Sequence, residues 1–433
     1  MMKEKVNFFW FRRDLRFIDN TGLINILKNN NIIPIFIFDI DITKNIDKDD
    51  ARINFIYENL FLMNNELRKV NSSILLKKGK VIDIWKNLIS KYDIKNISFN
   101  KDYEPYAIER DSNVKKLFKS YNIECRIYKD QVIYEENEIV KNDGSPYTVF
   151  TPYKNKWLKK FKEEQKKIIT NHLIFYDNFY KSDFNFPTLE SLGFKKSKIK
   201  VKPYSNININ NYSKNRDFPY LNKTSRMGPY LRFGIVSIRR LVYNSMEVSD
   251  TYLSELIWRE FFMQILFNFP NVIDKNFKPK YDNIKWINNS NDFEKWKNGN
   301  TGYPIVDAGM RELNETGYMH NRVRMITAGF LCKHLLTDWR HGEKYFAKKL
   351  LDFELSSNNG NWQWAAGTGC DSAPYFRIFN PFEQRKKFDP EYKYTKKWVK
   401  GLATKDYPQQ IIDHKIARNR AIKVYKEGLS KSI

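Results

Sequence analysis

Short runs of β-branched and aromatic residues alternate with amphipathic stretches in the first part of the chain, and this alternation restricts the possible folds more than any other feature. The runs Val6–Phe11, Ile32–Phe38 and Ile97–Phe99 contain no charged residue, which is typical of strands buried on both faces of a sheet. Strands that alternate with helices form parallel sheets. We therefore predict a Rossmann-like parallel α/β domain over residues 1–129, although neither a GxGxxG nor a GxxxxGKS/T string accompanies it.

The rest of the chain changes character twice. Residues 130–196 are polar and irregular, with a turn cluster at Asn142–Pro146 and with Pro152 and Pro187 as helix breakers, so we predict a long interdomain linker there. Helical periodicity dominates after that point, and we predict that residues 197–433 form an all-helical domain. The periodic stretches are Ser254–Phe267, Gly309–Asn314, Val323–Leu336, Gly342–Leu351 and Lys415–Lys426.

Cysteine usage and the N-terminus indicate the compartment. Cys125, Cys332 and Cys370 are far apart and form no CxxC pair, which argues against a disulfide framework, a structural zinc site and a four-cysteine iron–sulfur cluster. The histidines show no HExxH spacing, so we expect no metal. The first apolar run is interrupted at Arg12–Asp14, before a signal sequence or a membrane span is complete. We expect a cytoplasmic, monomeric protein without a membrane partner.

The charge balance points to a polyanionic partner. The 433 residues include 75 Lys and Arg against 50 Asp and Glu, a net charge of +25. Such a basic surface attracts nucleic acid. A composition rich in Lys and Asn can also reflect the base composition of a genome, and charge alone does not separate the two explanations.

Chemically versatile residues are densest in the predicted helical domain. Thr224, Ser225 and Arg226 precede Gly228 and a proline at a predicted helix start. Their hydroxyl groups, the backbone N–H groups and the cation suit a pyrophosphate, because helix starts attract anions. The same residues also fit an ordinary helix N-cap.

A second group lies in the stretch SELIWREFF. Glu255 and Trp258 are three positions apart and share a helix face, and Arg259 follows directly. A carboxyl group, a flat ring and a guanidinium group together suit a nucleotide base and its phosphate, through hydrogen bonding, stacking and charge. A tryptophan in an amphipathic helix is otherwise part of the core.

Two further stretches add amides and aromatic rings. Asn321 and Met325 lie one helical turn apart, after His320, which we expect to be a core histidine rather than a catalytic base. The stretch NNGNWQW, residues 358–364, combines amides, two tryptophans and a glycine that permits close approach of the backbone, which suits an aromatic cofactor. These residues alone indicate a flavin-binding or a nucleic-acid-binding protein.

Seven strings, taken together and in this order, resemble the photolyase/cryptochrome family over essentially the whole chain, and are most similar to the class I cyclobutane pyrimidine dimer (CPD) DNA photolyases. They are FWFRRDLR at Phe9–Arg16, ELIWREF at Glu255–Phe261, TGYPIVDAGMR at Thr301–Arg311, MHNRVRMIT at Met319–Thr327, NWQWAA at Asn361–Ala366, YFRIFNP at Tyr375–Pro381 and DYP at Asp406–Pro408.

The resemblance implies an antenna domain at the N-terminus, a linker, and a helical domain that holds FAD in a U shape. It also implies light-dependent repair of CPDs in UV-damaged DNA, in which blue light excites fully reduced, anionic FAD and an electron passes to a flipped-out dimer and returns. The predicted FAD contacts are Tyr212, Thr224, Ser225, Arg226, Gly228, Arg324, Asp352, Glu354 and Asn358, of which Asn358 faces the flavin N5. The family often has Ser in place of Gly228 and Asp in place of Glu354.

Other residues match the positions at which members of the family bind DNA. The predicted lesion pocket is Glu255, Trp258, Asn321, Met325 and Trp364, and the predicted phosphate contacts are Arg259, Arg322 and Arg377. Glu255, Asn321 and Asn358 are the predicted catalytic residues, and Glu255 in its protonated form would donate a hydrogen bond to a pyrimidine carbonyl. The chain Trp362, Trp339 and Trp286 is expected to carry electrons from the surface to the flavin.

The family leaves two alternatives and one open position. A (6-4) photolyase carries a pair of active-site histidines, where this chain has Asn321 and Met325, and many cryptochrome photosensors carry Asp or Cys in place of Asn358. Tyr103 and Glu104 match antenna contacts, for which methenyltetrahydrofolate, a deazaflavin, a flavin or no chromophore remain open.

Overall fold

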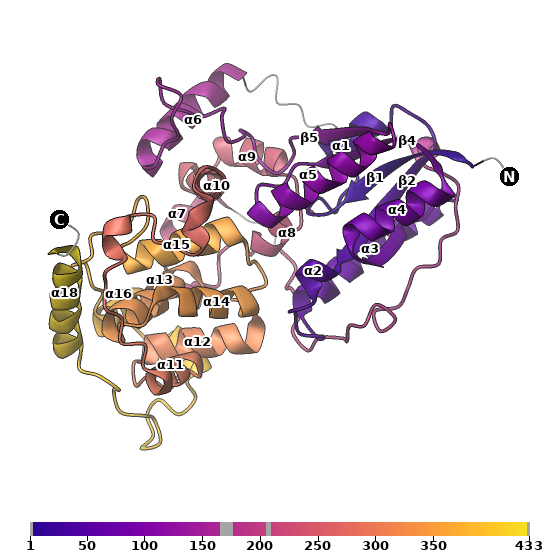
Figure 1. Cartoon of the computed structure of the whole chain (residues 1–433). Helices are drawn as coiled ribbons and strands as arrows, with labels where there is room; N and C mark the ends of the chain where they lie inside the picture. The colour runs from indigo at the N-terminus through magenta and orange to yellow at the C-terminus, as the bar shows by residue number, and fades with distance from the viewer. Residues whose placement is uncertain (1–2, 165–175, 205–208, 431–433) are drawn as a thin grey trace. The chain divides into compact units, whose positions relative to one another are not determined.

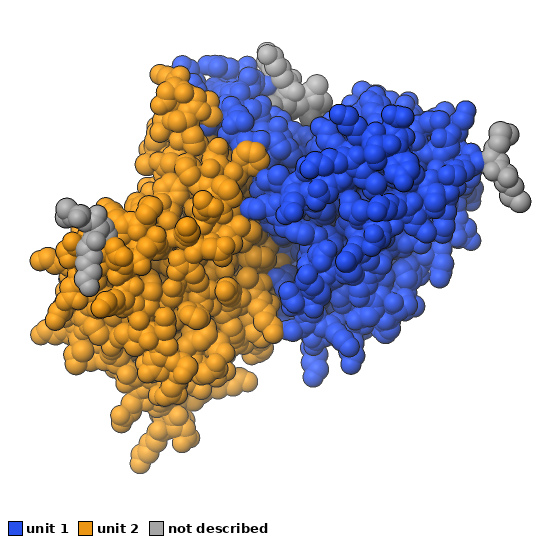
Figure 2. Space-filling model, in the orientation of Figure 1, with its two compact units in different colours: residues 1–139, 156–203, 227–246 blue, residues 140–155, 204–226, 247–433 orange. Residues whose placement is uncertain are grey.

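A computed structural model describes residues 3–164, 176–204 and 209–430 of the chain (Figure 1). The chain forms two compact units (Figure 2). Unit 1 comprises residues 1–139, 156–203 and 227–246, and unit 2 comprises residues 140–155, 204–226 and 247–433. Each unit has its own hydrophobic core. Among the described residues, no helix combines the length and the apolar composition that crossing a bilayer requires.

Unit 1 contains a five-stranded, wholly parallel sheet with the strand order β3-β2-β1-β4-β5, which confirms the predicted Rossmann-like α/β fold. The strands are β1 Lys5–Phe11, β2 Ile32–Asp39, β3 Leu75–Gly79, β4 Asp93–Asn100 and β5 Glu124–Tyr128. The helices along them are α1 Thr21–Ile26, α2 Ile40–Thr43, α3 Ala51–Arg68, α4 Val81–Lys91 and α5 Pro105–Ser120. Phe9 and Phe11 pack with α1 and α3 on one face of the sheet, and Phe8 and Trp10 pack with α4 and α5 on the other.

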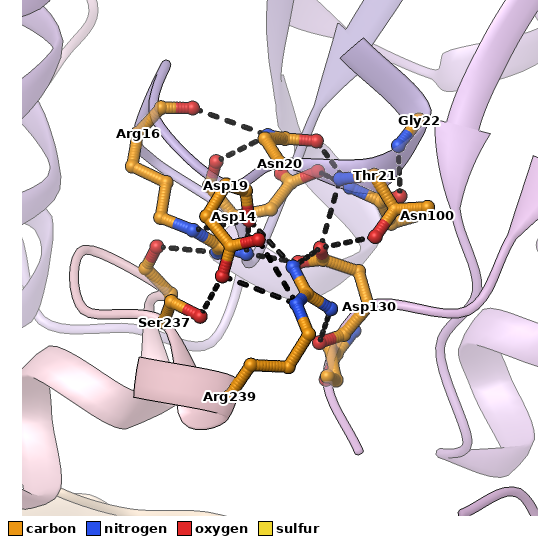
Figure 3. Close-up of polar contacts among 12 residues, drawn as sticks. Asp14, Arg16, Asp19, Asn20, Thr21, Gly22, Asn100, Asp130, Ser237 and Arg239 are labelled. Carbon is orange, nitrogen blue, oxygen red and sulfur yellow. Dashed lines mark hydrogen bonds and ion pairs between the residues drawn. The ribbon is translucent and has the colours of Figure 1, made fainter. Parts of the chain in front are cut away.

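The chain segment 227–246 belongs to unit 1 because buried ion pairs fix it at the carboxyl ends of the strands (Figure 3). The segment contains α8 Gly228–Arg232 and α9 Ile238–Met246. The Asp130 carboxylate accepts hydrogen bonds from Arg239 Nη2 at 2.8 Å and from Arg16 Nη2 at 2.7 Å. Burial alone would raise the pKa of Asp130, but these two guanidinium groups lower it to about 2. Asp14 beside them is fully buried, and its desolvation raises its pKa to about 6.

Unit 2 is helical, as predicted for the second half of the chain. Its helices are α7 Tyr212–Asn215, α10 Asp250–Asn268, α11 Ser290–Lys297, α12 Pro304–Thr316, α13 Asn321–Gly329, α14 Trp339–Lys349, α15 Leu355–Ala366, α16 Pro381–Phe388, α17 Lys393–Trp398 and α18 His414–Ser430. A π-helical turn, Phe330–His334, continues α13. Short 3-10 turns lie at Ile209–Asn211, Pro219–Leu221, Pro270–Ile273 and Pro279–Tyr281, and a further one, Tyr176–Asn178, lies in unit 1.

The prediction that residues 130–196 are irregular is wrong for one segment. Residues Phe150–Glu164 form the helix α6, and the predicted breaker Pro152 lies in its first turn. Proline is tolerated there, because the N–H groups of a first turn have no partner within the helix. The part of the predicted linker at residues 165–175 lies outside the described residues.

Candidate functional site

A pocket in unit 2 is formed by α13, α14, α15 and the loop between α14 and α15. Its lining combines a predicted lesion site with a predicted flavin site. The lining residues are Asn321, Arg324, Met325, Ala328, Phe346, Leu350, Asp352, Phe353, Glu354, Ser357, Asn358, Asn361, Trp362, Trp364 and Ala365. The structure therefore brings three separate sequence strings, MHNRVRM, DFEL and NNGNWQW, to one place.

A histidine cap fixes the start of α13. His320 is buried, and its Nδ1 accepts a hydrogen bond from the Arg322 N–H at 3.1 Å. Burial, assisted by the neighbouring cation Arg324, lowers the pKa of His320 to about 4, so the ring is neutral and able to accept. The cap orients the first turn of α13, which places Asn321 and Met325 together in the pocket wall. His320 is thus a structural histidine, as expected.

The predicted ion pair beside the pocket is formed. Arg324 Nη2 donates to Asp352 Oδ2 at 2.8 Å, and Arg324 Nε donates to the Met319 carbonyl oxygen at 2.8 Å. Burial alone would lower the pKa of Arg324, but the Asp352 carboxylate raises it above its ordinary value. The second oxygen of Asp352, Oδ1, is buried and has no hydrogen-bond partner among the described residues.

Asn358 is held by a residue that the sequence analysis missed. Its Nδ2 donates to the Glu343 carboxylate at 2.7 Å and to the Glu343 carbonyl oxygen at 3.1 Å. Burial raises the pKa of Glu343, although the hydrogen bond from Asn358 opposes the shift. Because both known contacts use the amide nitrogen, Asn358 keeps its Oδ1 as the acceptor. No pattern in the sequence links Glu343 on α14 to Asn358 on α15.

Helix α10 carries the other predicted lesion residues. Glu255 accepts a hydrogen bond from Arg216 Nη1 at 2.5 Å, and the two side chains form an ion pair. Arg259 pairs with Glu354 at 3.3 Å, which joins a predicted phosphate contact to a predicted flavin contact. Arg216 was not predicted from the sequence; it lies directly after α7 and 39 residues before its partner.

The helices α10 and α15 approach each other closely at Gly360. A Cβ atom added at Gly360 would lie 2.2 Å from Cδ1 of the Phe262 ring. The glycine in the NNGNWQW stretch therefore allows close approach, as expected, and the neighbour that it admits is a protein side chain.

The predicted pyrophosphate residues form a second polar group in unit 2. The Thr224 hydroxyl lies 2.9 Å from the Tyr318 hydroxyl, and the Arg226 guanidinium lies 4.1 Å from the centre of the Tyr318 ring. Arg226 has a φ of 50°, a left-handed conformation that is uncommon for a residue with a side chain. Ser225 hydrogen-bonds Tyr252, whose ring packs edge-on against Tyr212 at 5.0 Å.

Gly228 is assigned to unit 1, where it begins α8. Two other residues of unit 1 were predicted to contact an antenna chromophore, and both have internal partners. The Tyr103 hydroxyl donates to Glu135 at 3.0 Å, and Glu104 forms ion pairs with Arg13 and Arg232.

The three predicted electron-transfer tryptophans lie in different surroundings within unit 2. Trp362 and Trp339 are buried, and Trp286 is half-buried. The Trp339 indole N–H donates to Asn276 at 2.8 Å, and the Trp286 ring packs edge-on against Tyr425 at 5.9 Å. Trp362 packs edge-on against a tryptophan that the sequence analysis did not single out, Trp296, at 6.2 Å.

Of the two remaining predicted phosphate contacts, one is ion-paired and the other is exposed. Arg322 Nη2 donates to Asp217 at 2.7 Å, and the Arg322 guanidinium lies 4.3 Å from the centre of the Phe388 ring. Arg377 has an exposed side chain near the ring of Phe379.

Comparisons with known proteins show the family of the chain. The family model of DNA photolyase matches residues 7–169, and the model of the FAD binding domain of DNA photolyase matches residues 252–405. The deoxyribodipyrimidine photo-lyase of Buchnera aphidicola is 32% identical over an alignment that covers 98% of this chain and 98% of its own. Two solved photolyase structures superpose with a TM-score of 0.84: that from Sulfolobus tokodaii is 33% identical and covers 97% of this chain and 99% of its own. The other, a bacterial class III photolyase from Agrobacterium tumefaciens, is 29% identical and covers 99% and 98%. This chain belongs to the DNA photolyase family.

The pocket fits the flat isoalloxazine ring of FAD, which carries N–H donors and carbonyl acceptors on its edge. The buried, unpartnered Oδ1 of Asp352 is a free acceptor for a ligand N–H. Arg324 supplies positive charge beside it, and Asn358 supplies an oxygen acceptor. Trp362 and Phe353 supply apolar surface to the pocket. These residues would hold the cofactor.

Proposed function

We propose that this protein repairs cyclobutane pyrimidine dimers in UV-damaged DNA in a light-dependent reaction, as a class I photolyase. FAD, when bound in its reduced anionic form, would supply under blue light the electron that splits the cyclobutane ring, and the electron would then return to FAD. The observation that carries the proposal is the shared pocket, in which Asn321, Met325 and Trp364 lie beside Asn358 and the Arg324–Asp352 pair. Lesion and cofactor would meet there directly.

The lesion must leave the duplex to reach such a pocket. Base flipping costs a few kcal/mol, and least for a damaged base, so part of the selectivity resides in the DNA. Trp258 and Trp364 would replace the lost stacking at roughly 1–3 kcal/mol per base. Arg259, Arg322 and Arg377 would contact phosphates and make the affinity dependent on salt.

The residues around the pocket then have separate tasks. Arg324 places positive charge near the ring and favours its anionic form. Asn358 offers a neutral acceptor, which Glu343 keeps in one orientation. The Arg216–Glu255 pair offers both a donor and an acceptor to a pyrimidine edge. The chain Trp362, Trp339 and Trp286 would carry electrons to the cofactor from the surface.

The pocket composition supports CPD repair over (6-4) repair. None of the residues that line the pocket, all within the described part of the chain, is a histidine. His320 uses its Nδ1 to cap α13, so the neutral ring carries its proton on Nε2. Asn358, in place of Asp or Cys, supports a repair enzyme over a cryptochrome photosensor.

Three less specific proposals accompany this one. Residues 1–129 would serve as an antenna domain, 130–196 as a linker and 197–433 as the catalytic domain. An antenna chromophore near Tyr103 and Glu104 would absorb light for the flavin. The protein would act as a cytoplasmic monomer.

Illumination of the purified protein with defined oligonucleotides tests the proposal. The protein, loaded with chemically reduced FAD, receives either a thymine CPD or a (6-4) product, and the restored thymines are quantified by chromatography. We expect restoration of the CPD under blue light, none in the dark, and none of the (6-4) product under either condition. Repair of the (6-4) product, or no repair by protein that carries reduced FAD, would refute it.

A further inference from the structure

One face of Trp258 is covered by a ring from another part of the chain. Phe150 stacks on it with a centroid distance of 3.6 Å and an interplanar angle of 9°. The two rings are therefore close to parallel. Phe150 is buried, with 7% of its surface exposed, whereas Trp258 is only half-buried. Trp258 thus has one face committed to the protein and retains exposed surface.

Phe150 is itself fixed at the first turn of α6. Its backbone N–H donates to the Asp371 carboxylate at 3.1 Å, which satisfies one of the N–H groups that a helix start leaves free. Phe261 packs edge-on against both rings, at 5.8 Å from Phe150 and 5.5 Å from Trp258. Phe262 also packs against Trp258, at 5.4 Å and with an interplanar angle of 28°. Three rings therefore hold the indole, which stays half-buried.

Two further contacts bind the same turn of α6 to α10. The Tyr153 hydroxyl lies 3.4 Å from Glu260 Oε1, and Lys154 Nζ donates to the Ser254 hydroxyl at 3.1 Å. Ser254, Trp258 and Phe261 belong to consecutive turns of α10. The first turn of α6 thus supports the part of α10 that carries Trp258.

A supported ring binds a base at lower cost than a mobile ring. An interface side chain that must be immobilised costs about 0.5–1.5 kcal/mol on binding, and preorganisation removes this cost. Without Phe150, the indole of Trp258 would lose its parallel partner and gain rotational freedom. The effect should appear in the recognition of an unstacked base, and contacts to phosphates should be insensitive to it.

We propose that Phe150, held by Asp371, is a positioning residue that fixes the ring of Trp258 for stacking against the flipped-out base of a lesion. Phe150 acts through Trp258 and does not itself touch the DNA. The inference rests on the proposed function, since it requires that Trp258 stacks on a damaged base.

Dark titration of the FAD-loaded protein with DNA at fixed salt tests the inference. The probes are a duplex with one thymine CPD and the same duplex without damage. Trp258→Ala should weaken binding to the damaged duplex by about 5- to 150-fold, which corresponds to stacking worth roughly 1–3 kcal/mol. Phe150→Ala should weaken it by about 2- to 10-fold, the range that immobilisation of one side chain implies. The affinity for undamaged DNA should stay unchanged in both variants.

The double variant separates positioning from a merely structural role. If Phe150 acts through Trp258, then adding Phe150→Ala to Trp258→Ala should change the damaged-DNA affinity by less than about twofold. Phe293→Ala is the matched control, because Phe293 also stacks on a tryptophan, Trp296, at 5.7 Å. It should leave both DNA affinities unchanged. Phe150→Leu, which keeps the apolar volume but not the flat ring, covers the case in which the alanine variant does not fold.

Asp371 provides a second, independent perturbation. Asp371→Ala should reproduce part of the effect of Phe150→Ala, and Asp371→Asn, which keeps an oxygen acceptor, should restore the wild-type affinity. If the preference for damaged DNA depends on Trp258 but not on Phe150, or if the losses of affinity in the double variant are additive, the inference is overturned and the proposed function stands. A wild-type protein without any preference for damaged DNA would overturn the proposed function as well.

Discussion

Replacing Gly360 by alanine should destabilise unit 2, although alanine is the better helix former. In the interior of α15 the exchange would gain about 1 kcal/mol from helix propensity alone. The new Cβ, however, would lie 2.2 Å from Cδ1 and 2.3 Å from Cε1 of the Phe262 ring. Carbon atoms in contact are separated by about 3.5–4.0 Å, so the ring would have to retreat by more than about 1 Å.

The magnitude follows from the position of Phe262. Its side chain is buried and lies between α10 and α15, so it moves only together with its neighbours. Overpacking of this kind costs roughly 1–3 kcal/mol. The gain in helix propensity offsets about 1 kcal/mol of this cost, so the free energy of unfolding should fall by up to about 2 kcal/mol.

A second glycine provides the matched control. Gly329 ends α13 with φ of −61°, and the nearest atom to its added Cβ is Phe379 Cδ2 at 3.9 Å, an ordinary contact. Gly329→Ala should therefore be neutral or stabilise the protein by up to about 1 kcal/mol. Both variants are compared by urea unfolding followed by circular dichroism, with FAD retention as a second readout. Equal stabilities of Gly360→Ala and Gly329→Ala would refute the steric reasoning.

Three further predictions concern single side chains. His320 is neutral in the folded state, with a pKa of about 4, and takes up a proton on unfolding below its ordinary pKa of about 6.5. Between pH 7 and pH 5 this group should therefore lower the free energy of unfolding by up to about 2 kcal/mol. His320→Asn keeps a helix cap but cannot take up the proton, so urea titrations of this variant should show a smaller loss of stability over the same pH range. An unchanged pH slope would contradict this. Trp362→Phe should abolish the light-driven reduction of bound oxidised FAD, which is followed by flavin absorbance. The control Trp398→Phe, elsewhere in unit 2, should leave this reduction intact. Reduction at the wild-type rate in Trp362→Phe would exclude the proposed route. Arg377→Ala should weaken damaged and undamaged DNA equally and lower the salt slope of binding by about one, and a loss confined to damaged DNA would show that Arg377 contacts the lesion instead.

The sheet shows how far sequence patterns reach. The strands β1, β2 and β4 were predicted because they are central in the sheet. β1 and β2 are buried over nearly their whole length, and β4 is buried over its second half, where the predicted run Ile97–Phe99 lies. The edge strands β3 and β5 were missed. Their sequences, LLKKG and ECRIY, contain lysines, a glutamate and an arginine, and most of their residues are exposed or half-exposed. Edge strands carry charges that limit aggregation, and such charges also hide the strand pattern.

The helix α6 was missed for a related reason. Pro152 suggested a break, but a proline in the first turn starts a helix as readily as it ends one. The choice depends on what the helix can pack against. Here Phe150 and Tyr153 meet α10, about one hundred residues further along the chain, and nothing local in the sequence indicates that partner.

The same limit separates two kinds of residue at the candidate site. Residues that line the pocket occur in compact strings, because adjacent positions on α13 and α15 face the same cavity, and these strings were recognisable. The residues that fix them come from elsewhere: Glu343 orients Asn358, Arg216 pairs with Glu255, and Phe150 stacks on Trp258. Each of these partners is a single side chain that lies far away in the sequence. No regular spacing along the chain therefore reveals it. Because they set the orientation of groups that would touch a ligand, their removal should alter recognition without removing any contact to the ligand itself. The double variant of Phe150 and Trp258 measures this kind of coupling directly.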